Sequence, residues 1–202
     1  KGYPDGGVHP TANITRAEVS AIFYRLLSVD ARKQYAATSS SFADANKSWA
    51  AAEIATLTNA GILKGYTDGS FRPNAAITRA EFASIAARFD KLSGGNKTFS
   101  DVPSNHWAYA AITSAAEKGW VNGYSDGTFR PDNAITRSEV VKITNAVLGR
   151  SCDKDYVAKN ISKLTSYNDL SNTYWAYYDI LEASNAHDYK TASGVESWTG
   201  LK

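Results

Sequence analysis

The sequence predicts an all-α domain in which three copies of a two-helix repeat close into three lobes with pseudo-threefold symmetry. Three observations predict this fold. One motif occurs three times, an apolar stripe of helical period follows each copy, and a second helix-forming segment comes after each stripe. The chain of 202 residues is long enough to bury the core that such a domain needs.

The repeated motif ends in a pentad that reads Ile-Thr-Arg-Ala-Glu twice and Ile-Thr-Arg-Ser-Glu once, at residues 14–18, 77–81 and 135–139. A Thr followed three residues later by a Glu is the capping box that begins a helix. The expected N-caps are Thr15, Thr78 and Thr136. Their expected capping partners are Glu18, Glu81 and Glu139. Each pentad is therefore predicted to start a helix.

An arginine stands inside each capping box, at Arg16, Arg79 and Arg137. A cation in the first turn lies at the positive end of the helix dipole, which costs roughly a few tenths of a kcal/mol. Three arginines at the same unfavourable place indicate that each one holds an anion. The N–H groups of a helix start, which have no partner within the helix, would reinforce such a site.

The pentads belong to longer similar segments, which we call B halves: residues 2–28, 65–92 and 123–149. Between residues 65–82 and 123–140, twelve of the 18 aligned positions are identical. Each B half has an Asp-Gly turn, and the turn-forming aspartates are Asp5, Asp68 and Asp126. A Gly-Tyr pair precedes each turn: Gly2 and Tyr3, Gly65 and Tyr66, Gly123 and Tyr124. These glycines could allow a ligand to approach closely.

The second segment, the A half, occurs at residues 42–63, 99–121 and 167–189. Each copy carries an aromatic residue, an Asp and then a tryptophan, and the tryptophans are Trp49, Trp107 and Trp175. These tryptophans could be core anchors or platforms for a sugar ring, and the same two roles are open to the tyrosines of the B halves. Gly61 and Gly119 stand where a helix C-terminal glycine belongs, and His187 takes that place in the third copy.

The halves follow one another as B, A, B, A, B, A, so the chain opens and closes halfway through a repeat. If the last A half docks on the first B half, the repeats close into a ring and need no capping units. Connectors are expected at residues 30–41, 93–97 and 149–166, the last with a short helix near 157–164. In the tail, residues 190–202, the expected anchors are Trp198 and Leu201.

Composition and charge exclude several classes of protein. The net charge of +2 and the lack of a Lys/Arg-rich run argue against nucleic-acid binding. No apolar run has the length of a membrane span, and no signal peptide is visible. The sequence has no Met, which indicates a processed product or a fragment.

Reactive residues are also sparse. Cys152 is the single cysteine and has no neighbouring base, so we expect a bystander. The histidines His9, His106 and His187 do not have metal-ligand spacing, so we expect no metal and no cofactor. Equivalent aspartates in three turns do not form the unequal acid pair of a glycosidase, so we expect no enzymatic activity.

The sequence resembles the surface-layer homology (SLH) repeat of bacterial cell-envelope proteins. The resemblance rests on residues 99–103 with 106–108, on the Gly-Tyr-Ser-Asp-Gly-Thr-Phe-Arg-Pro of 123–131, and on the pentad of 135–139. It covers nearly the whole chain and implies an all-helical, three-lobed domain at one end of a larger exported protein. The implied function is non-covalent attachment of this protein to cell-wall polysaccharide, outside the cell.

The resemblance also implies a ligand, namely polysaccharide that often carries pyruvate ketals on N-acetylmannosamine. The ketal carboxylate would be the anion for the pentad arginines, which the family uses as ligand contacts. A guanidinium matches a carboxylate with two parallel hydrogen bonds, and each such pair could contribute about 1.5–3 kcal/mol when shielded from water. The expected sugar-binding residues are therefore Arg16, Arg79, Arg137, Trp49, Trp107, Trp175, Gly2, Tyr3, Gly65, Tyr66, Gly123 and Tyr124.

The three copies do not match the family pattern equally well. Val8 and His9 replace the Phe-Arg pair of the other two B halves, and the third A half has Tyr167 and Asn168 where Phe and Ser stand in the second. The groove made from these two halves should be the most divergent. Two alternatives to polysaccharide binding stay open, which are protein–protein assembly of a surface layer and binding of peptidoglycan itself. The fused cargo is expected beyond the N-terminus.

Overall fold

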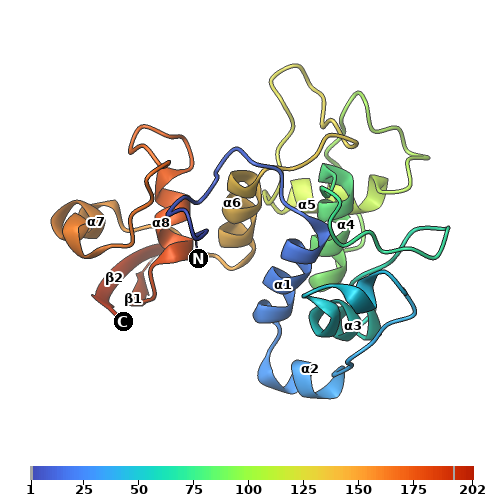
Figure 1. Ribbon diagram of the computed structural model, residues 1–202. Helices are drawn as coiled ribbons and strands as arrows, with labels where there is room; N and C mark the ends of the chain where they lie inside the picture. Colours follow the sequence, from blue (N-terminus) through green and yellow to red (C-terminus); the bar gives the residue numbers. More distant parts are fainter. Residues whose placement is uncertain (1, 193) are drawn as a thin grey trace. The chain divides into compact units, whose positions relative to one another are not determined.

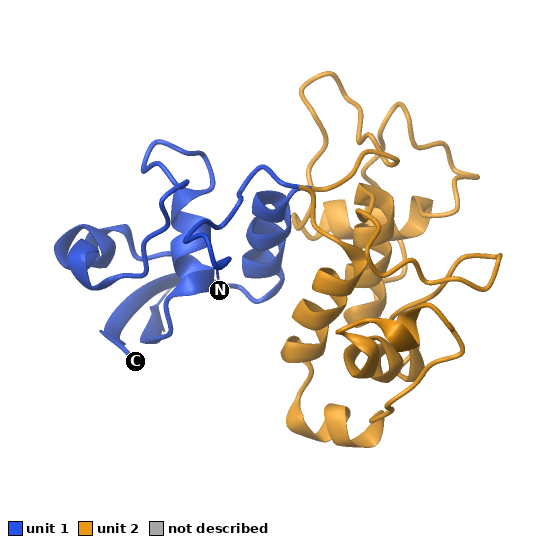
Figure 2. Cartoon of the chain, in the orientation of Figure 1, with its two compact units in different colours: residues 1–12, 136–202 blue, residues 13–135 orange. Residues whose placement is uncertain are grey.

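The computed structural model describes residues 2–192 and 194–202, and it divides into two compact units. One unit comprises residues 1–12 and 136–202, and the other comprises residues 13–135 (Figure 2). We call them unit 1 and unit 2. Helices dominate both units (Figure 1). The division does not follow the repeats, because the turn of the first B half belongs to unit 1 and its helix to unit 2.

Unit 2 holds six helical segments: α1 (Arg16–Leu26), α2 (Val29–Gln34), η1 (Ala45–Lys47), α3 (Ala51–Asn59), α4 (Arg79–Phe89) and α5 (Tyr109–Glu117). The helices of the B halves pack on those of the A halves that follow them, α1 on α3 and α4 on α5. Their apolar side chains form the core between them, since Ile54, Phe82 and Ile112 are fully buried. The ring of Phe23 on α1 contacts the ring of Phe82 on α4, at 5.7 Å between centroids.

The helix boundaries follow the local signals in the sequence. In α1, α4 and α6 (Arg137–Val147) the pentad forms a complete capping box. In α4, for example, Thr78 accepts the N–H of Glu81 while the Glu81 carboxylate accepts the N–H of Thr78. Beyond the last turns of α3 and α5, Gly61 and Gly119 have φ of 74° and 73°, a conformation that glycine adopts without strain.

The isoleucines of the three pentads form a closed hydrogen-bonded ring within unit 2. The N–H of Ile14 donates to the carbonyl of Ile135, that of Ile135 to Ile77, and that of Ile77 to Ile14, at 3.0–3.2 Å. All three side chains are buried, at 2% exposure or less. The pentads are therefore joined to one another directly before their helices begin.

Unit 1 contains α6, α7 (Lys154–Asn160), η2 (Ile161–Lys163), α8 (Tyr177–Ser184), β1 (His187–Ala192) and β2 (Val195–Leu201). Helix α6 packs on α8, again a B helix on the A helix that follows it. Strands β1 and β2 form an antiparallel hairpin with a register shift between Asp188 and Tyr189. The buried Trp198 of β2 packs with Val157, Leu164 and Leu181, and Leu201 packs against this cluster.

The all-α expectation is wrong for the C-terminal segment. The helix of the third A half was expected to end near His187 and to pass into a tail at residues 190–202. In the structure, α8 ends at Ser184, and the residues from His187 to Ala192 and from Val195 to Leu201 form the strands β1 and β2 instead. The hairpin brings Glu196 and Trp198 to its buried side, which gives the strand a core of its own. Helix α2 was also not predicted, whereas the short helix expected near 157–164 corresponds to α7 and η2. The half-repeat boundaries themselves stay predictions.

Candidate functional site

The side chain of Arg16 is buried at the junction of two copies of the motif. Its Nε donates to the carbonyl of Phe71 at 2.8 Å, and its Nη2 donates to the carbonyl of Lys64 at 3.0 Å. Its Nη1 lies 3.0 Å from Oε1 of Glu81, and the side chain is only 5% exposed. The guanidinium charge predicted to meet an external anion is therefore already paired with a glutamate of the chain.

The other two pentad arginines make similar bonds to the backbone. Arg79 donates from Nε to the carbonyl of Phe129 at 2.8 Å and from Nη2 to that of Asn122 at 2.9 Å. Arg137 donates from Nε to the carbonyl of Val8 at 3.0 Å. Each pentad arginine thus ties its helix to the turn of another B half, which gives its recurrence a structural reason.

The N–H groups at the helix starts are not available to a ligand. Arg16 and Ala17 of α1 donate their N–H groups to the carbonyls of Ala75 and Pro73, at 3.0 and 2.9 Å. In α4, Arg79 donates its N–H to Asn133, and in α6, Arg137 donates its N–H to Ala12. The expectation that these N–H groups help to bind an anion is wrong, because carbonyls of another copy already satisfy them.

Glu81 connects three parts of unit 2. Its Oε2 accepts a hydrogen bond from the N–H of Thr78 at 2.9 Å. Its Oε1 accepts a hydrogen bond from the hydroxyl of Tyr66 at 2.5 Å and forms the ion pair with Arg16. Burial raises the pKa of the Tyr66 hydroxyl, and its hydrogen bond to Glu81 raises it further. The predicted cap residue is therefore also the internal counter-ion of an arginine from the preceding copy.

The turns of the B halves are held by carboxylates whose role the sequence did not reveal. Asp44 accepts the N–H groups of Phe71 and Arg72, the latter at 2.7 Å. Asp101 and Asp169 make the same pairs of bonds in the other turns, Asp101 to Phe129 and Arg130, Asp169 to Val8 and His9. The signal was present in the sequence as the aromatic-x-Asp pattern of every A half.

Within each turn, the predicted aspartate also holds the residue that follows the turn. Asp68 pairs with Arg72 at 2.7 Å, and Asp126 pairs with Arg130 at 2.9 Å. Asp5 makes the corresponding bond to the imidazole of His9 at 2.7 Å. These three partners all have positive φ, between 50° and 57°. The ion pairs are exposed, so they stabilise the local turn only weakly.

The glycines of the Gly-Tyr pairs are required by packing. A Cβ on Gly65 would overlap the ring of Phe42, and one on Gly123 would overlap the ring of Phe99. A Cβ on Gly2 would overlap Tyr167 in the same way. The glycines therefore admit the aromatic residue that begins an A half, which explains them without a sugar.

The neighbouring tyrosines stack with arginines. The Tyr66 ring lies 4.8 Å from the Arg16 guanidinium and 4.1 Å from that of Arg72. Tyr124 lies 5.1 Å from Arg79 and 3.9 Å from Arg130. The ring of Tyr3 lies 4.7 Å from the guanidinium of Arg137. Because cations already cover these rings, they are poorer platforms for a sugar than the sequence suggested.

The tryptophans are more open to solvent than the tyrosines, of which Tyr3 and Tyr124 are each 38% exposed. Trp49, Trp107 and Trp175 are 64%, 61% and 55% exposed. Their burial is too low for core anchors, and their role as sugar platforms stays a prediction. The isoleucines five residues further on, including Ile54 and Ile112, supply the core contact instead.

Several predicted residues meet in one cavity of about 510 Å³ in unit 2. Its lining includes Arg16 from the first B half, Tyr66 and Glu81 from the second, and Trp107 from the second A half. The full lining is Arg16, Lys64, Gly65, Tyr66, Thr67, Thr78, Glu81, Ser84, Ile85, Arg88, Trp107 and Asp132. The predicted residues Arg79, Arg137, Trp49 and Trp175 do not line this cavity.

The cavity holds more positive than negative charge. Three cations line it, namely Arg16, Lys64 and Arg88, against the carboxylates of Glu81 and Asp132. Burial lowers the pKa of the Arg88 guanidinium, and the nearby charge of Arg16 lowers it further. Two cations that disfavour each other in one partly closed space form a suitable environment for an anion.

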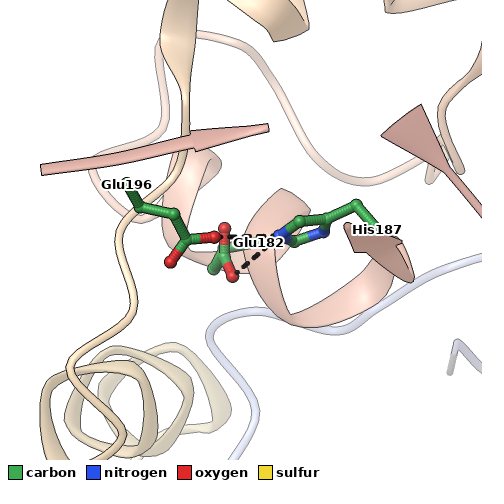
Figure 3. A group of neighbouring side chains, drawn as sticks. All are labelled: Glu182, His187 and Glu196. Carbon is green, nitrogen blue, oxygen red and sulfur yellow. Dashed lines mark hydrogen bonds and ion pairs between the residues drawn. The ribbon is translucent and has the colours of Figure 1, made fainter. Parts of the chain in front are cut away.

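In unit 1, the side chains of Glu182, His187 and Glu196 point toward one another, between α8 and the hairpin (Figure 3). All three are buried, and together they could offer the ligand atoms of a metal site. However, Nη2 of Arg150 lies 2.8 Å from Glu182, 2.7 Å from His187 and 3.0 Å from Glu196. A guanidinium already supplies the positive charge at this place, so the cluster is explained as an ion-pair network.

Other groups in unit 1 do not indicate chemistry. Burial raises the pKa of the Cys152 thiol to about 12, which keeps it protonated and unreactive at neutral pH. Among the described residues, no helix has both the length and the apolar character that crossing a membrane would take.

A profile of the S-layer homology domain matches the chain at residues 1–20, 41–83 and 98–141, more than half of its length. The chain belongs to this family. The matches place it among extracellular proteins of the bacterial cell wall and surface layer, and they point to a module without a reaction of its own.

The relatives of the chain are larger proteins. "Cell surface glycoprotein 1" of Acetivibrio thermocellus is 39% identical over 216 residues, covering 100% of this chain and 9% of the relative. "Cellulosome-anchoring protein" of the same organism is 38% identical over 197 residues, covering 94% of this chain and 42% of the relative. "S-layer protein EA1" of Bacillus anthracis is 31% identical over 147 residues, covering 70% of this chain and 16% of the relative. The chain thus spans less than half the length of these relatives.

Proposed function

We propose that this chain anchors a larger protein to the bacterial cell wall by binding wall polysaccharide in the cavity beside Arg16. One observation carries the proposal. The cavity gathers residues from three separate motif copies and combines an exposed tryptophan with an excess of cations. An open aromatic face and fixed charge are what a polar sugar chain with acidic groups requires. The names of the relatives, which include an anchoring protein, agree with this function.

The finer proposal is that the polysaccharide carries pyruvate ketals on N-acetylmannosamine. The C–H face of a sugar ring would lie on Trp107, and the ketal carboxylate would meet the positive charge of the cavity. Arg16, which is paired with Glu81, forms part of the wall of the cavity. Gly65 and Tyr66 contribute the turn that shapes the same wall.

We propose weaker or absent binding for the corresponding residues of the other copies. These are Arg79 with Gly123 and Tyr124, and Arg137 with Gly2 and Tyr3, with Trp49 and Trp175 as their candidate platforms. The turn after Tyr3 departs from the others because His9 replaces an arginine, so the copy with Arg137 is the one that we expect to bind least.

A pull-down on purified wall polysaccharide tests the anchoring. We expect Trp107→Ala to reduce the bound fraction at least tenfold with an unchanged melting temperature, because this side chain is exposed. Trp49→Ala is the matched control, since Trp49 is as exposed but does not line the cavity. Equal losses for both variants would place binding elsewhere. Retention by peptidoglycan freed of polysaccharide, or by a second copy of the chain alone, would favour one of the alternative partners.

We also propose that the three repeats close into lobes with pseudo-threefold symmetry. Two recurring sets of bonds support this closure. The pentad isoleucines donate to one another in a cycle, and the aspartates of all three A halves hold the turn of the B half that follows, with Asp169 holding the first turn. If closure is correct, removing the residues after Gly149 should lower the melting temperature by well over 5 °C. An unchanged melting temperature would contradict it.

A further inference from the structure

We propose that Arg88, rather than the pentad arginine, receives the acidic group of the ligand in the cavity, which makes Arg88 a specificity-determining residue for acidic sugars. This inference rests on the proposed function. It follows from a comparison of the cations in the cavity, because Arg16 is paired with a carboxylate of the chain and, among the residues that the structure describes, Arg88 is not.

Arg16, the pentad arginine of this cavity, already has partners within the chain for most of its hydrogen-bonding groups and for its charge. Arg16 bonds to two carbonyls and pairs with Glu81, and its side chain is almost completely buried. Adding a ligand carboxylate beside Glu81 would bring two negative charges together, which is unfavourable in a partly closed space. Arg16 therefore positions the wall, and its charge is balanced before a ligand arrives.

Arg88 is in the opposite condition. Its side chain is half-buried. Among the described residues its hydrogen-bond partner is the carbonyl of Ile62, at the long distance of 3.4 Å from Nη1. Glu81, Ser84, Ile85 and Arg88 follow one another along the face of α4 that lines the cavity. Because a guanidinium has five N–H donors in a planar fork, most of its donors are left for a carboxylate.

The other charged groups in the cavity do not neutralise Arg88. Lys64 is an exposed cation, and Asp132 is an exposed carboxylate that solvent screens. Glu81 is engaged by Arg16, Tyr66 and the cap of α4. The uncompensated positive charge of the cavity therefore lies at Arg88 and Lys64.

Arg88 also distinguishes its helix from the other B helices. The same position is Arg25 in α1, where the side chain is exposed, and Ala146 in α6. A half-buried arginine that could bind the acidic group of a ligand is therefore found at this position in α4 but not in α1 or α6. The three motif copies would then differ in their preference for acidic sugar, although their pentads are nearly identical.

The probe is the methyl glycoside of N-acetylmannosamine bearing a pyruvate ketal, compared with its carboxyl methyl ester, which has the same shape without the charge. Binding to the full chain is measured by calorimetry for the wild type, Arg88→Gln and Arg25→Gln. We expect the wild type to prefer the acid to the ester at least tenfold. Arg88→Gln should abolish this preference while leaving the affinity for the ester unchanged, and Arg25→Gln should behave like the wild type.

A second readout does not depend on the fold of a variant. In the wild type, the Nε–H resonance of Arg88 should shift on titration with the acid and stay in place with the ester. If Arg88→Gln keeps the full preference, or if the Arg88 resonance does not respond, the inference is wrong and the anchoring function stands. The inference is also wrong, and the anchoring function still stands, if the wild type binds the polysaccharide but has equal affinity for the acid and the ester. Both proposals are wrong if the wild type binds neither of the two compounds nor the polysaccharide.

Discussion

Arg16 in unit 2 and Arg150 in unit 1 both form ion pairs with glutamates, but their surroundings differ. Both arginines pair with buried or partly buried glutamates. Around Arg150, the carboxylates of Glu182 and Glu196 are each 2% exposed, and His187 completes the network. Around Arg16 there is instead a cavity of about 510 Å³.

The difference lies in the balance of charge. In the Arg150 network, one guanidinium and the imidazole of His187 contact two carboxylates, so each carboxylate has partners within the chain. The indole N–H of Trp198 satisfies the remaining oxygen of Glu182 at 3.0 Å, which closes the network. In the cavity, the cations outnumber the carboxylates, and within the described part of the chain Arg88 forms no ion pair. Removing one partner from a closed buried network leaves a charge unpaired and is costly. A cavity with unbalanced charge is suited to a charged ligand.

The largest effect is expected when the closed network is broken. Arg150→Ala would leave Glu182 and Glu196 buried without their main counter-ion, so we expect a loss of about 3 kcal/mol in the free energy of unfolding. Urea denaturation of the full chain measures this loss. Burial already raises the pKa of Glu182, even with His187 and Arg150 beside it, so this carboxylate should take up a proton in the variant.

An exposed ion pair of the same hairpin provides the control. Lys202 lies 2.8 Å from Asp188, and both side chains are more than half exposed. Lys202→Ala should change the free energy of unfolding by less than about 0.5 kcal/mol, because solvent screens such pairs. If both variants lost the same stability, burial would not be what distinguishes the Arg150 network.

A medium effect is expected when charge is removed from the cavity wall. Glu81→Gln deletes the counter-ion of Arg16 and weakens the cap of α4, so stability should fall by about 1–3 kcal/mol. The same change makes the cavity more positive, so binding of acidic polysaccharide should become tighter. Denaturation and a binding titration on the same preparation show whether stability and affinity move in opposite directions.

Glu53→Gln is the control for this variant. Glu53 lies in the first turn of α3 and does not line the cavity, so its neutralisation should leave binding unchanged and alter stability by about 0.5 kcal/mol or less. A weaker affinity in Glu81→Gln, with the fold intact, would show that the glutamate contacts the ligand directly.

Much of the helical fold could be predicted because its signals are local. The capping boxes of Thr15, Thr78 and Thr136 and the positive φ of Gly61 and Gly119 depend on residues within one turn. The hairpin was missed because the third A half was read by analogy with the first two. The contacts of His187, which stands in place of a glycine, and of Glu196 and Trp198 in the tail are made with α8 and Arg150, and these contacts exist only in the folded chain.

The site was predicted less completely than the fold. Sequence comparison identified residues that recur in the three copies. A residue can recur because the fold requires it as well as because it binds a ligand. Arg16 and Gly65 recur because they join copies of the motif, to the Phe71 carbonyl and around the Phe42 ring. Arg88 lies outside the repeated pentad, and its counterparts are Arg25 in the first copy and Ala146 in the third, so pattern comparison did not single it out. Its importance depends on a cavity and on missing counter-charge, which are properties of the folded chain.

The smallest effect is expected for carboxylates that are held by backbone N–H groups instead of by cations. Burial alone would raise the pKa of Asp169, but the hydrogen bonds from Val8 and His9 outweigh it and hold this pKa below its ordinary value. The folded state therefore binds fewer protons than the unfolded state. Its stabilisation is present above the unfolded pKa, about 4, and is lost as the pH falls through the lower folded value.

Asp169→Asn should therefore destabilise the chain at pH 7, by at most about 1 kcal/mol because the side chain is exposed. The gap to the wild type should shrink as the pH is lowered below 4, where the wild-type carboxyl also becomes neutral. Melting temperatures of the wild type and the variant, measured from pH 7 to pH 3, follow this gap. A gap that stayed constant across this range would mean that Asp169 acts through its shape, and that the charge of the turn carboxylates contributes nothing to closing the first turn on the third A half.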